Sequence, residues 1–438
     1  MIDEYEIVVV GAGVAGLAAA RALATAGRRV ALVEARDRVG GRIFTRDVAA
    51  RGSGPMRVEL GAEFIHGKPD NLWSIVREAA LSTVERHGSR YRYAGGRLMP
   101  DTQDNSPAFE VLERMGAWAA ALPPGRDASF AEYLAGTATA ADVRAQATAY
   151  VEGFNAADRN VVSVRALVKQ QQAEDAIDGD RLFHVVDGYD AIPRFLAERF
   201  ESAGGCLRLG HPVRTIRWTR HAVSLGGWDA EGRDFDMRCR RAVITLPLGV
   251  LQEGTVQFDP APMQVLTPAR CLRMGRATRM TLLFRSRFWR DDMSFLFSAE
   301  ERPPTWWTPF PDPAPMITAW AAGPNSAALE AEIGIDAAPD ALARQCLHAL
   351  AKIFRVAEAD LDDLFVSSHA HDWQSDVYAR GAYSYAAAGG IDASSIMAQP
   401  IERTLYFAGE HTDTTGHWGT VHAALGSGDR AAAQLLSD

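Results

Sequence analysis

The stretch Ile7-Val8-Val9-Val10-Gly11-Ala12-Gly13-Val14-Ala15-Gly16 decides the fold of this chain. Its apolar start predicts a buried strand of a parallel sheet. The glycines form the pattern G-x-G-x-x-G, in which Gly11 permits a tight turn, Gly13 lets the backbone approach a pyrophosphate, and Gly16 lets helix and strand pack closely. The Ala-rich residues from about 15 to 26 predict that helix, and its N-terminus would present free N–H groups and a positive dipole to phosphate.

The next elements complete a dinucleotide-binding unit. Gly27 ends the helix, and residues 29–33 predict a second strand. Glu34 stands at the carboxyl end of this strand, 18 residues after Gly16, where an acidic side chain can bind the ribose hydroxyls of an adenosine group. Strand, helix, strand and acid in this order predict an α/β fold with a Rossmann-like cofactor-binding domain.

A second glycine-rich loop follows directly. Arg36-Asp37-Arg38-Val39-Gly40-Gly41-Arg42 contains R-x-G-G-R, which resembles the second phosphate-contact loop of large FAD-dependent oxidoreductases. Two flexible glycines and a cation suit the wrapping of a diphosphate, and an NAD site does not normally need this loop. The cofactor is therefore predicted to be FAD. Its expected contacts in this part of the chain are Gly11, Gly13, Ala15, Gly16, Glu34, Ala35, Arg36, Gly41 and Arg42.

Composition and charge exclude several classes of protein. With 438 residues, 47% of them hydrophobic and 23% charged, the chain is expected to form two or three globular units. A net charge of −9 without a strong basic run argues against nucleic-acid binding. The sequence predicts no transmembrane helix, and its acidic start is unlike a secretory signal. The 4 Cys residues lack CxxC spacing, so they predict neither a zinc centre nor a disulfide framework, and we expect a reducing compartment, the cytoplasm.

Segments far along the chain carry a wider resemblance. They are Glu59-Leu60-Gly61-Ala62-Glu63-Phe64-Ile65-His66-Gly67, Gly381-Ala382-Tyr383-Ser384-Tyr385, Met397-Ala398-Gln399-Pro400-Ile401, Leu405-Tyr406-Phe407-Ala408-Gly409-Glu410-His411-Thr412 and Trp418-Gly419-Thr420-Val421-His422. Together with the glycine-rich turn they resemble the flavin-containing amine oxidases, a family that includes monoamine oxidases, polyamine oxidases and lysine-specific histone demethylases. The resemblance covers nearly the whole chain, and its motifs are most similar to the polyamine oxidase branch.

The resemblance implies a division into two domains. Residues 1–75, 185–265 and 386–438 would form a discontinuous FAD-binding domain, and residues 76–184 and 266–385 a substrate-binding domain. The first insertion is Ala-rich and expected to be helical. The second contains a predicted helix at 338–354 and a Pro-rich stretch in which Trp306 and Trp307 are expected to lie in a surface loop.

The resemblance also implies further contacts with the cofactor. These contacts are Gly61, Ala62, Glu63, Val213, Trp373, Gly409, Glu410, Thr420 and Val421. Ala382 stands where monoamine oxidases carry the cysteine that links FAD covalently, so the FAD should be bound non-covalently.

Oxidation of an amine moves a hydride from the carbon next to nitrogen to N5 of the flavin. The cofactor supplies this chemistry while the protein orients a neutral amine and excludes water, so no metal is required. The resemblance implies that Tyr383 forms an aromatic wall beside the flavin; the alternative is a core tyrosine with a satisfied hydroxyl. The opposite wall is tyrosine in monoamine oxidases, but Thr420 stands there, and Trp418 could supply the missing ring.

Arg279 is the main departure from the family pattern. The family has lysine at this position, five residues before Phe284, and that lysine holds a water against flavin N5 and is tied to oxygen reactivity. Arginine is planar, bulkier and permanently charged, so the exchange is not conservative. We expect Arg279 near N5 and slow reaction of the reduced flavin with oxygen. A one-residue slip in the strand register is the alternative.

Other polar residues are candidates for contact with the substrate. His66 is expected at the substrate entrance, where a neutral imidazole could accept a hydrogen bond from, or deprotonate, an ammonium group. A histidine bonded only to backbone is the alternative. Candidate partners of a cationic substrate are Glu63, Glu152, Glu174 and Asp187.

The predicted function is FAD-dependent oxidation of a polyamine-like primary or secondary amine. The imine would hydrolyse to an aldehyde, with H2O2 formed where oxygen is the acceptor. The alternatives are an L-amino-acid oxidase-like or desaturase-like flavoenzyme, whose substrate carboxylate an arginine would clamp, and a flavin-binding protein with little turnover. A histone-demethylase role is not expected, because the chain has no room for a chromatin-targeting domain. The expected partners are a small-molecule amine and an electron acceptor, either molecular oxygen or another compound, with no nucleic acid and no membrane. The sequence leaves open whether the chain forms a homodimer.

Overall fold

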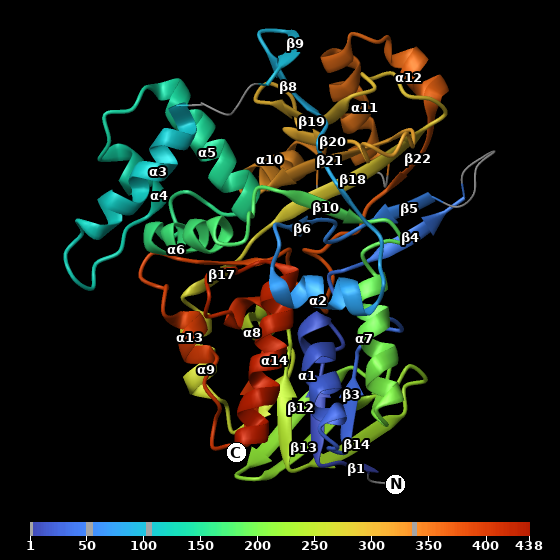
Figure 1. Cartoon of the computed structure of the whole chain (residues 1–438), viewed down its shortest axis with the longest axis vertical. Coiled ribbons are helices and arrows are strands. Elements are labelled where there is room, and N and C mark those ends of the chain that lie inside the picture. The colour runs from blue at the N-terminus through green and yellow to red at the C-terminus, as the bar shows by residue number, and fades with distance from the viewer. Residues whose placement is uncertain (1–2, 50–55, 102–106, 335–339) are drawn as a thin grey trace.

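A five-stranded parallel sheet forms the lower half of the molecule in Figure 1, in the order β11-β3-β2-β15-β24. The computed structural model describes residues 3–49, 56–101, 107–334 and 340–438. The strands of this sheet are β2 (Ile7–Val10), β3 (Val30–Val33), β11 (Cys206–Arg208), β15 (Arg241–Ile244) and β24 (Leu405–Phe407). The two predicted strands near the N-terminus are confirmed, and they pair in parallel with Ile7 opposite Val30.

Two layers cover this sheet. Helices α1 (Val14–Thr25), α7 (Ala191–Ser202) and α14 (Val421–Ser437) pack on one face. A second sheet on the other face has the order β1-β14-β13-β12-β16, with bounds Asp3–Glu4, Asp234–Cys239, Ala222–Trp228, Val213–Thr219 and Gln257–Asp259. Because side chains alternate along β2, Ile7 and Val9 face the helices while Val8 faces the second sheet. Burial on both faces explains the unbroken apolar run.

The turn after β2 needs glycine for steric reasons. Gly11 has a φ of +102°, which side chains rarely allow. A Cβ on Gly16 would lie 1.8 Å from the carbonyl oxygen of Gly11, so only glycine lets α1 begin this close to the strand. A Cβ on Gly13 would meet no atom within 4 Å, so its backbone borders open space.

A seven-stranded sheet lies in the upper half of Figure 1, in the order β22-β18-β21-β20-β19-β8-β9. Its strands are β8 (Ser89–Ala94), β9 (Arg97–Pro100), β18 (Ala277–Phe284), β19 (Met293–Ser298), β20 (Thr305–Trp307), β21 (Met316–Ala322) and β22 (Phe365–His369). Helix α11 (Ala341–Phe354) packs on one face, where Leu350 shares a core with Leu282 and Ile317. The predicted helix at 338–354 is therefore confirmed over 341–354, and residues 338 and 339 lie outside the described residues.

The expected surface loop around Trp306 and Trp307 is wrong. Both residues belong to β20, between β21 and β19, and they are 0% and 6% exposed. Side chains alternate along the strand, so Trp306 enters the core beneath α11 and Trp307 lines the cavity described below. The neighbouring prolines lie outside this three-residue strand and remove none of its hydrogen bonds.

The first insertion is only partly helical. Its helices α3 (Pro107–Ala120), α4 (Phe130–Ala135), α5 (Ala141–Asn155) and α6 (Val164–Asp175) gather on the left of Figure 1. The insertion also supplies β7 (Thr83–Glu85), β8, β9 and β10 (Leu182–Val185), and β10 pairs with β6 (Ile65–His66). Strand pairing thus ties the insertion to the motif at residues 59–67. The division into an FAD-binding and a substrate-binding domain stays a prediction.

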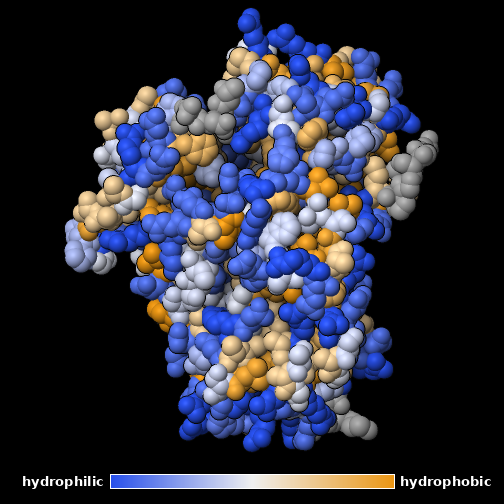
Figure 2. Space-filling view, viewed as in Figure 1, coloured by the Kyte–Doolittle hydropathy of each residue, from blue (hydrophilic) through white to orange (hydrophobic). Residues whose placement is uncertain are grey.

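The remaining elements connect these layers. They are α2 (Asp70–Glu78), α8 (Leu248–Glu253), α9 (Met263–Ala269), α10 (Pro324–Ile333), α12 (Glu358–Leu364), α13 (Ala393–Met397), β4 (Thr45–Val48), β5 (Met56–Glu59), β17 (Leu272–Met274), β23 (Ser384–Ala386) and the 3₁₀ helix η2 (Glu410–Thr412). The described parts of the chain contain no helix with the length and apolar character needed to cross a membrane. Hydrophilic residues dominate the face seen in Figure 2, and its hydrophobic residues are scattered.

Candidate active site

One large cavity, with a volume of about 1490 Å³, is lined by residues from both halves of the molecule. It brings together the site residues predicted from the sequence, apart from Gly16 and the candidate carboxylate Asp187. They are Gly11, Gly13, Ala15, Glu34, Ala35, Arg36, Gly41, Arg42, Gly61, Ala62, Glu63, His66, Glu152, Glu174, Val213, Arg279, Trp373, Tyr383, Gly409, Glu410, Trp418, Thr420 and Val421. Gly16 packs against Gly11 instead, as its predicted role requires. The cofactor contacts of the lining residues stay predictions.

Glu34 fits the predicted role of binding a ribose. It follows β3 and is 5% exposed. One carboxylate oxygen accepts a hydrogen bond from the N–H of Ala12 at 2.7 Å, and the other accepts from the N–H of Arg36 at 2.9 Å. An ionised carboxylate has about four acceptor sites, so these two bonds leave capacity for ribose hydroxyls.

Arg42 ties the second glycine-rich loop to the C-terminal motifs. Its guanidinium donates to the carbonyl oxygen of Ala382 at 2.7 Å and to the Glu410 carboxylate at 2.9 Å. Glu410 also accepts from the hydroxyl of Ser384 at 2.6 Å and from the N–H of Gly419 at 3.2 Å. Burial raises the pKa of Glu410, but Arg42 and the hydrogen bonds lower it further, so the pKa lies below its usual range. This buried anion therefore holds three separate segments around the cavity.

Helix α14 begins at the cavity. Thr420 caps it, because its hydroxyl accepts from the N–H of Ala423 at 3.1 Å and donates to the carbonyl oxygen of His417 at 2.7 Å. Thr420 and Val421 both line the cavity. The free N–H groups and positive dipole of the helix are thus available to an anionic edge of the cofactor.

A buried ion pair joins Arg279 to Glu63. Arg279 lies in β18 and is 7% exposed, and its guanidinium donates to the Glu63 carboxylate and, at 2.9 Å, to the carbonyl oxygen of Gly61. The indole N–H of Trp307 donates to the same carboxylate at 3.0 Å, and Nε2 of His184 lies 3.1 Å from it. Burial raises the pKa of Glu63, but the nearby positive charges, Arg279 foremost, lower it below its usual range. The Glu63 carboxylate is therefore ionised, and the positive charge of Arg279 balances its negative charge.

Three residues around Glu63 were not predicted as site residues from the sequence, namely Trp307, His184 and Arg86. Arg86 lies 2.7 Å from Nε2 of His184 and donates to the hydroxyl of Ser294 at 3.1 Å. Burial lowers the pKa of His184 to about 4, so its imidazole is neutral at pH 7. Only the tertiary fold brings these side chains together, because they come from β20, β10 and the segment after β7.

Aromatic side chains form much of the cavity wall. The hydroxyl of Tyr383 donates to the carbonyl oxygen of Phe154 at 2.6 Å, and its ring packs on Gly419, where a Cβ would lie 3.0 Å from the ring. Trp418 is 7% exposed, and its indole N–H donates to the carbonyl oxygen of Asp413 at 2.9 Å. Tyr383 and Trp418 thus line the same cavity, and their placement against the flavin stays a prediction.

His66 has the surroundings expected of a proton acceptor. Its ring lies 5.7 Å from that of Phe154 and 6.3 Å from that of Phe64, measured between centroids. Its buried Nδ1 has no hydrogen-bond partner among the described residues. Burial lowers the pKa of His66 and the Glu174 carboxylate opposes this, so the ring is neutral at pH 7.

The candidate carboxylates differ in their placement. Asp187 is absent from the cavity lining; its side chain is 57% exposed and pairs with Arg57. Glu152 and Glu174 do line the cavity. Glu152 accepts from the N–H of Arg159 at 3.4 Å, and burial raises its pKa. In the described part of the chain, neither Glu152 nor Glu174 forms an ion pair with a lysine or arginine.

The glycine cradle, the carboxylate after β3 and the enclosed cavity define a dinucleotide-dependent oxidoreductase of the Rossmann-like class. The chain belongs to the family described as flavin containing amine oxidoreductase, whose model matches residues 14–436. The predicted fold and FAD cofactor are thereby confirmed.

Relatives and solved structures agree with this assignment. Human lysine-specific histone demethylase 2 is 26% identical over 98% of this chain and 53% of its own length. Lysine-specific histone demethylase 1 homolog 2 of Arabidopsis thaliana is 27% identical over 99% of this chain and 58% of its own length. The chain thus spans about half the length of the curated relatives it matches.

Two solved structures show the same fold. Wild-type putrescine oxidase bound to putrescine has a TM-score of 0.83 at 22% identity and full coverage of both chains. Cyclohexylamine oxidase from Brevibacterium oxydans has a TM-score of 0.81 at 22% identity, covering 99% of each chain.

Proposed function

We propose that this chain oxidises a polyamine-like primary or secondary amine to an imine, which hydrolyses to an aldehyde. FAD would supply the hydride acceptor when bound, and the electrons would go to oxygen, giving H2O2, or to another acceptor. The observation that carries the proposal is a cavity lined in part by aromatic side chains and by a buried carboxylate, Glu152, that forms no ion pair with a lysine or arginine of the described chain.

Glu152 would hold the ammonium group that does not react. Burial raises the pKa of Glu152 because an isolated carboxylate is poorly solvated there. A cationic amine beside it would restore the charged form and gain a charge-assisted hydrogen bond. Glu63 is a weaker candidate for this role, since Arg279 already neutralises it.

Tyr383 and His66 would prepare the reacting end of the substrate. The Tyr383 ring is fixed by its hydrogen bond to Phe154 and by Gly419, so it can hold an amine in one orientation. The unpartnered Nδ1 of the neutral His66 can accept a proton from an ammonium group. The amine must lose that proton before hydride transfer.

The pairing of Arg279 weakens the case for an amino-acid substrate. A carboxylate clamp needs an arginine with free donors, but the guanidinium of Arg279 already donates to Glu63 and Gly61. The demethylase relatives favour a different test substrate, a methylated lysine, which is also a secondary or tertiary amine.

Anaerobic bleaching of the flavin tests the proposal. The panel contains 1,4-diaminobutane, butylamine, L-amino acids and a peptide with dimethyl-lysine. We expect the diamine to bleach the flavin at the lowest concentration. Bleaching by amino acids alone would support the amino-acid oxidase alternative, and bleaching by the peptide alone would favour a demethylase. No bleaching by any of them would identify a flavin-binding protein with little turnover.

Glu152→Gln tests the role of the carboxylate. Loss of one charge-assisted hydrogen bond worth about 1.5–3 kcal/mol should raise the half-saturating diamine concentration about 10- to 150-fold. Butylamine has no second ammonium group, so its half-saturating concentration should stay the same. Glu113→Gln is a matched control, because Glu113 is exposed at the same cavity. Equal effects of the two substitutions would rule out a specific contact with Glu152.

A further inference from the structure

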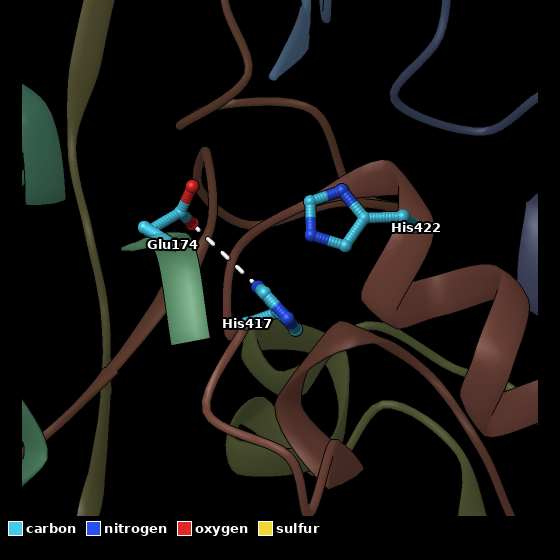
Figure 3. Close-up of side chains that lie close together, drawn as sticks. All are labelled: Glu174, His417 and His422. Atoms are coloured by element: carbon cyan, nitrogen blue, oxygen red, sulfur yellow. Dashed lines mark ion pairs between the residues drawn. The ribbon is translucent and has the colours of Figure 1, made fainter. Parts of the chain in front are cut away.

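We propose that Glu174, His417 and His422 form a binding site for a divalent transition-metal ion, with Zn²⁺ as the representative ion. Glu174 lies in the last turn of α6, His417 in the loop before α14, and His422 in the first turn of α14. Figure 3 shows the carboxylate and the two imidazoles converging on one another. The site does not depend on the amine oxidation proposed above.

The spacing of the three side chains suits a metal with imidazole and carboxylate ligands. One ligand atom from each lies within 4.8 Å of the others. Oε1 of Glu174 is 3.8 Å from Nδ1 of His417, and the two imidazole centroids are 4.6 Å apart with the rings nearly perpendicular. Ligands of tetrahedral zinc at bond lengths of about 2.0–2.1 Å lie about 3.4 Å apart. Small side-chain rotations would therefore close the site.

The proposed ligand atoms form no hydrogen bond with any residue in the described part of the chain. Both carboxylate oxygens of Glu174, Nδ1 of His417 and Nε2 of His422 are buried without a hydrogen-bond partner there. His422 is 4% exposed, and the side chains of Glu174 and His417 are each 14% exposed. An unsatisfied buried polar group costs about 1–3 kcal/mol, so several together call for a ligand. A single metal ion would satisfy one atom from each residue.

The backbone around the ligands is held in place. The Asp413 carboxylate accepts from the N–H of Gly416 at 2.8 Å and from the N–H of His417 at 3.0 Å. The amide of Asn71 donates to the carbonyl oxygen of His422 at 2.9 Å. These contacts fix the two histidines before any ion binds, which reduces the entropic cost of binding.

The site stands between two cavities. Glu174 and His422 line the large cavity, whereas His417 and His422 line a second cavity of about 400 Å³. Three protein ligands leave a tetrahedral ion one open position, and both cavities can supply a water molecule to it. The ion would thus sit in the wall that separates the substrate cavity from the smaller one.

Zinc binding to the FAD-loaded chain tests the site. The chain, without an affinity tag, is stripped of metal with a chelator and dialysed against Zn²⁺ at about 1–100 μM, and bound zinc is measured by mass spectrometry. We expect one zinc per chain in the wild type. His417→Ala and Glu174→Gln should weaken binding by about 100-fold or more, since even the loss of a residue that only hydrogen-bonds to a metal ligand costs about 10- to 100-fold.

His348→Ala is the matched control. Nδ1 of His348 lies 2.7 Å from Glu358 in another histidine–carboxylate pair, which is exposed and has no third ligand among the described residues. Its loss should leave zinc binding unchanged. Flavin absorbance shows whether each variant remains folded. If His417→Ala loses FAD, Glu174→Gln carries the test, because glutamine preserves the shape of the glutamate side chain. The proposal is overturned if the wild type binds no zinc at 100 μM, or if the control variant loses as much binding as the site variants.

Discussion

Replacing Arg279 by lysine separates the structural role of this side chain from its influence on the flavin. The guanidinium of Arg279 donates to two groups, the Glu63 carboxylate and the carbonyl oxygen of Gly61. A lysine ammonium can keep the ion pair but not both directed bonds. Arg279→Lys should therefore lose one charge-assisted hydrogen bond, or about 1.5–3 kcal/mol in the free energy of unfolding. Arg279→Met would leave the buried Glu63 without its cation and should lose about 3–5 kcal/mol.

The functional consequence concerns the reaction with oxygen. Gly61 and Glu63, the two partners of Arg279, are both predicted flavin contacts, which supports a position for Arg279 beside the flavin. Lysine keeps the positive charge that stabilises a reduced flavin, so anaerobic reduction by substrate should change little. The smaller ammonium group leaves room for water and oxygen. We expect reoxidation to accelerate about tenfold more than reduction changes, which corresponds to about 1.4 kcal/mol in barrier height.

Stopped-flow spectroscopy measures the two half-reactions separately, and urea unfolding followed by tryptophan fluorescence measures stability. Arg276→Lys is the control, because Arg276 stands just before the same strand but is exposed and pairs with Glu330, where little stability is at stake. Equal effects of Arg279→Lys on both half-reactions, or a wild type that already reoxidises as fast as the variant, would refute the control of oxygen reactivity by Arg279. Equal destabilisation by lysine and methionine would refute the account of the ion pair.

Three further outcomes follow from the site. Glu34→Ala should weaken FAD binding about tenfold or more, as it removes about 1.5–3 kcal/mol of hydrogen bonding, and unchanged FAD retention after dialysis would contradict the ribose contact. Acid precipitation should release yellow flavin, because Ala382 offers no sulfur for a covalent bond; flavin that stays in the pellet would disprove this. Burial lowers the pKa of His184 to about 4, below the 6.5 of the unfolded chain, so its contribution to stability is fully present above pH 6.5 and is lost as pH falls towards 4, by about 3 kcal/mol at most. His184→Gln should flatten the fall in urea stability between pH 7 and 4, and an identical slope would exclude His184 as its source.

The sequence predicted the part of the site that local geometry specifies. The turn at Gly11 and Gly16 follows from steric limits that act within ten residues, and an acidic residue at position 34 follows from the length of one helix and one strand. The segments at 59–67, 381–385 and 405–412 were placed in the same site through resemblance, and all three do line one cavity. Periodicity could not predict that these segments meet, because each contains residues of a strand that pairs with a strand far away in the chain.

Ion pairs between residues far apart in the chain could not be predicted from the sequence. Arg279 and Glu63 are 216 residues apart, and nothing near either one indicates the other. The same holds for Glu174 and His417, because Glu174 lies in α6 and His417 in the loop before α14, far apart in the chain. Trp307 was misassigned for a related reason: prolines mark a loop locally, whereas the burial of β20 depends on its neighbours β19 and β21.

Three of the carboxylates that line the cavity differ in how their charges are compensated, and this connects the two proposed sites. Glu63 is neutralised by Arg279, Glu174 lies beside two imidazoles, and Glu152 accepts a hydrogen bond from a backbone N–H without an ion pair. A divalent ion on Glu174 would turn a negative group into one with a net positive charge, leaving Glu152 as the main attraction for a cation. Zinc should therefore raise the half-saturating concentration of a diamine more than that of butylamine, and His417→Ala should abolish the difference. If zinc affects both amines equally, or still acts on the variant, the ion binds elsewhere or does not influence the substrate cavity through its charge.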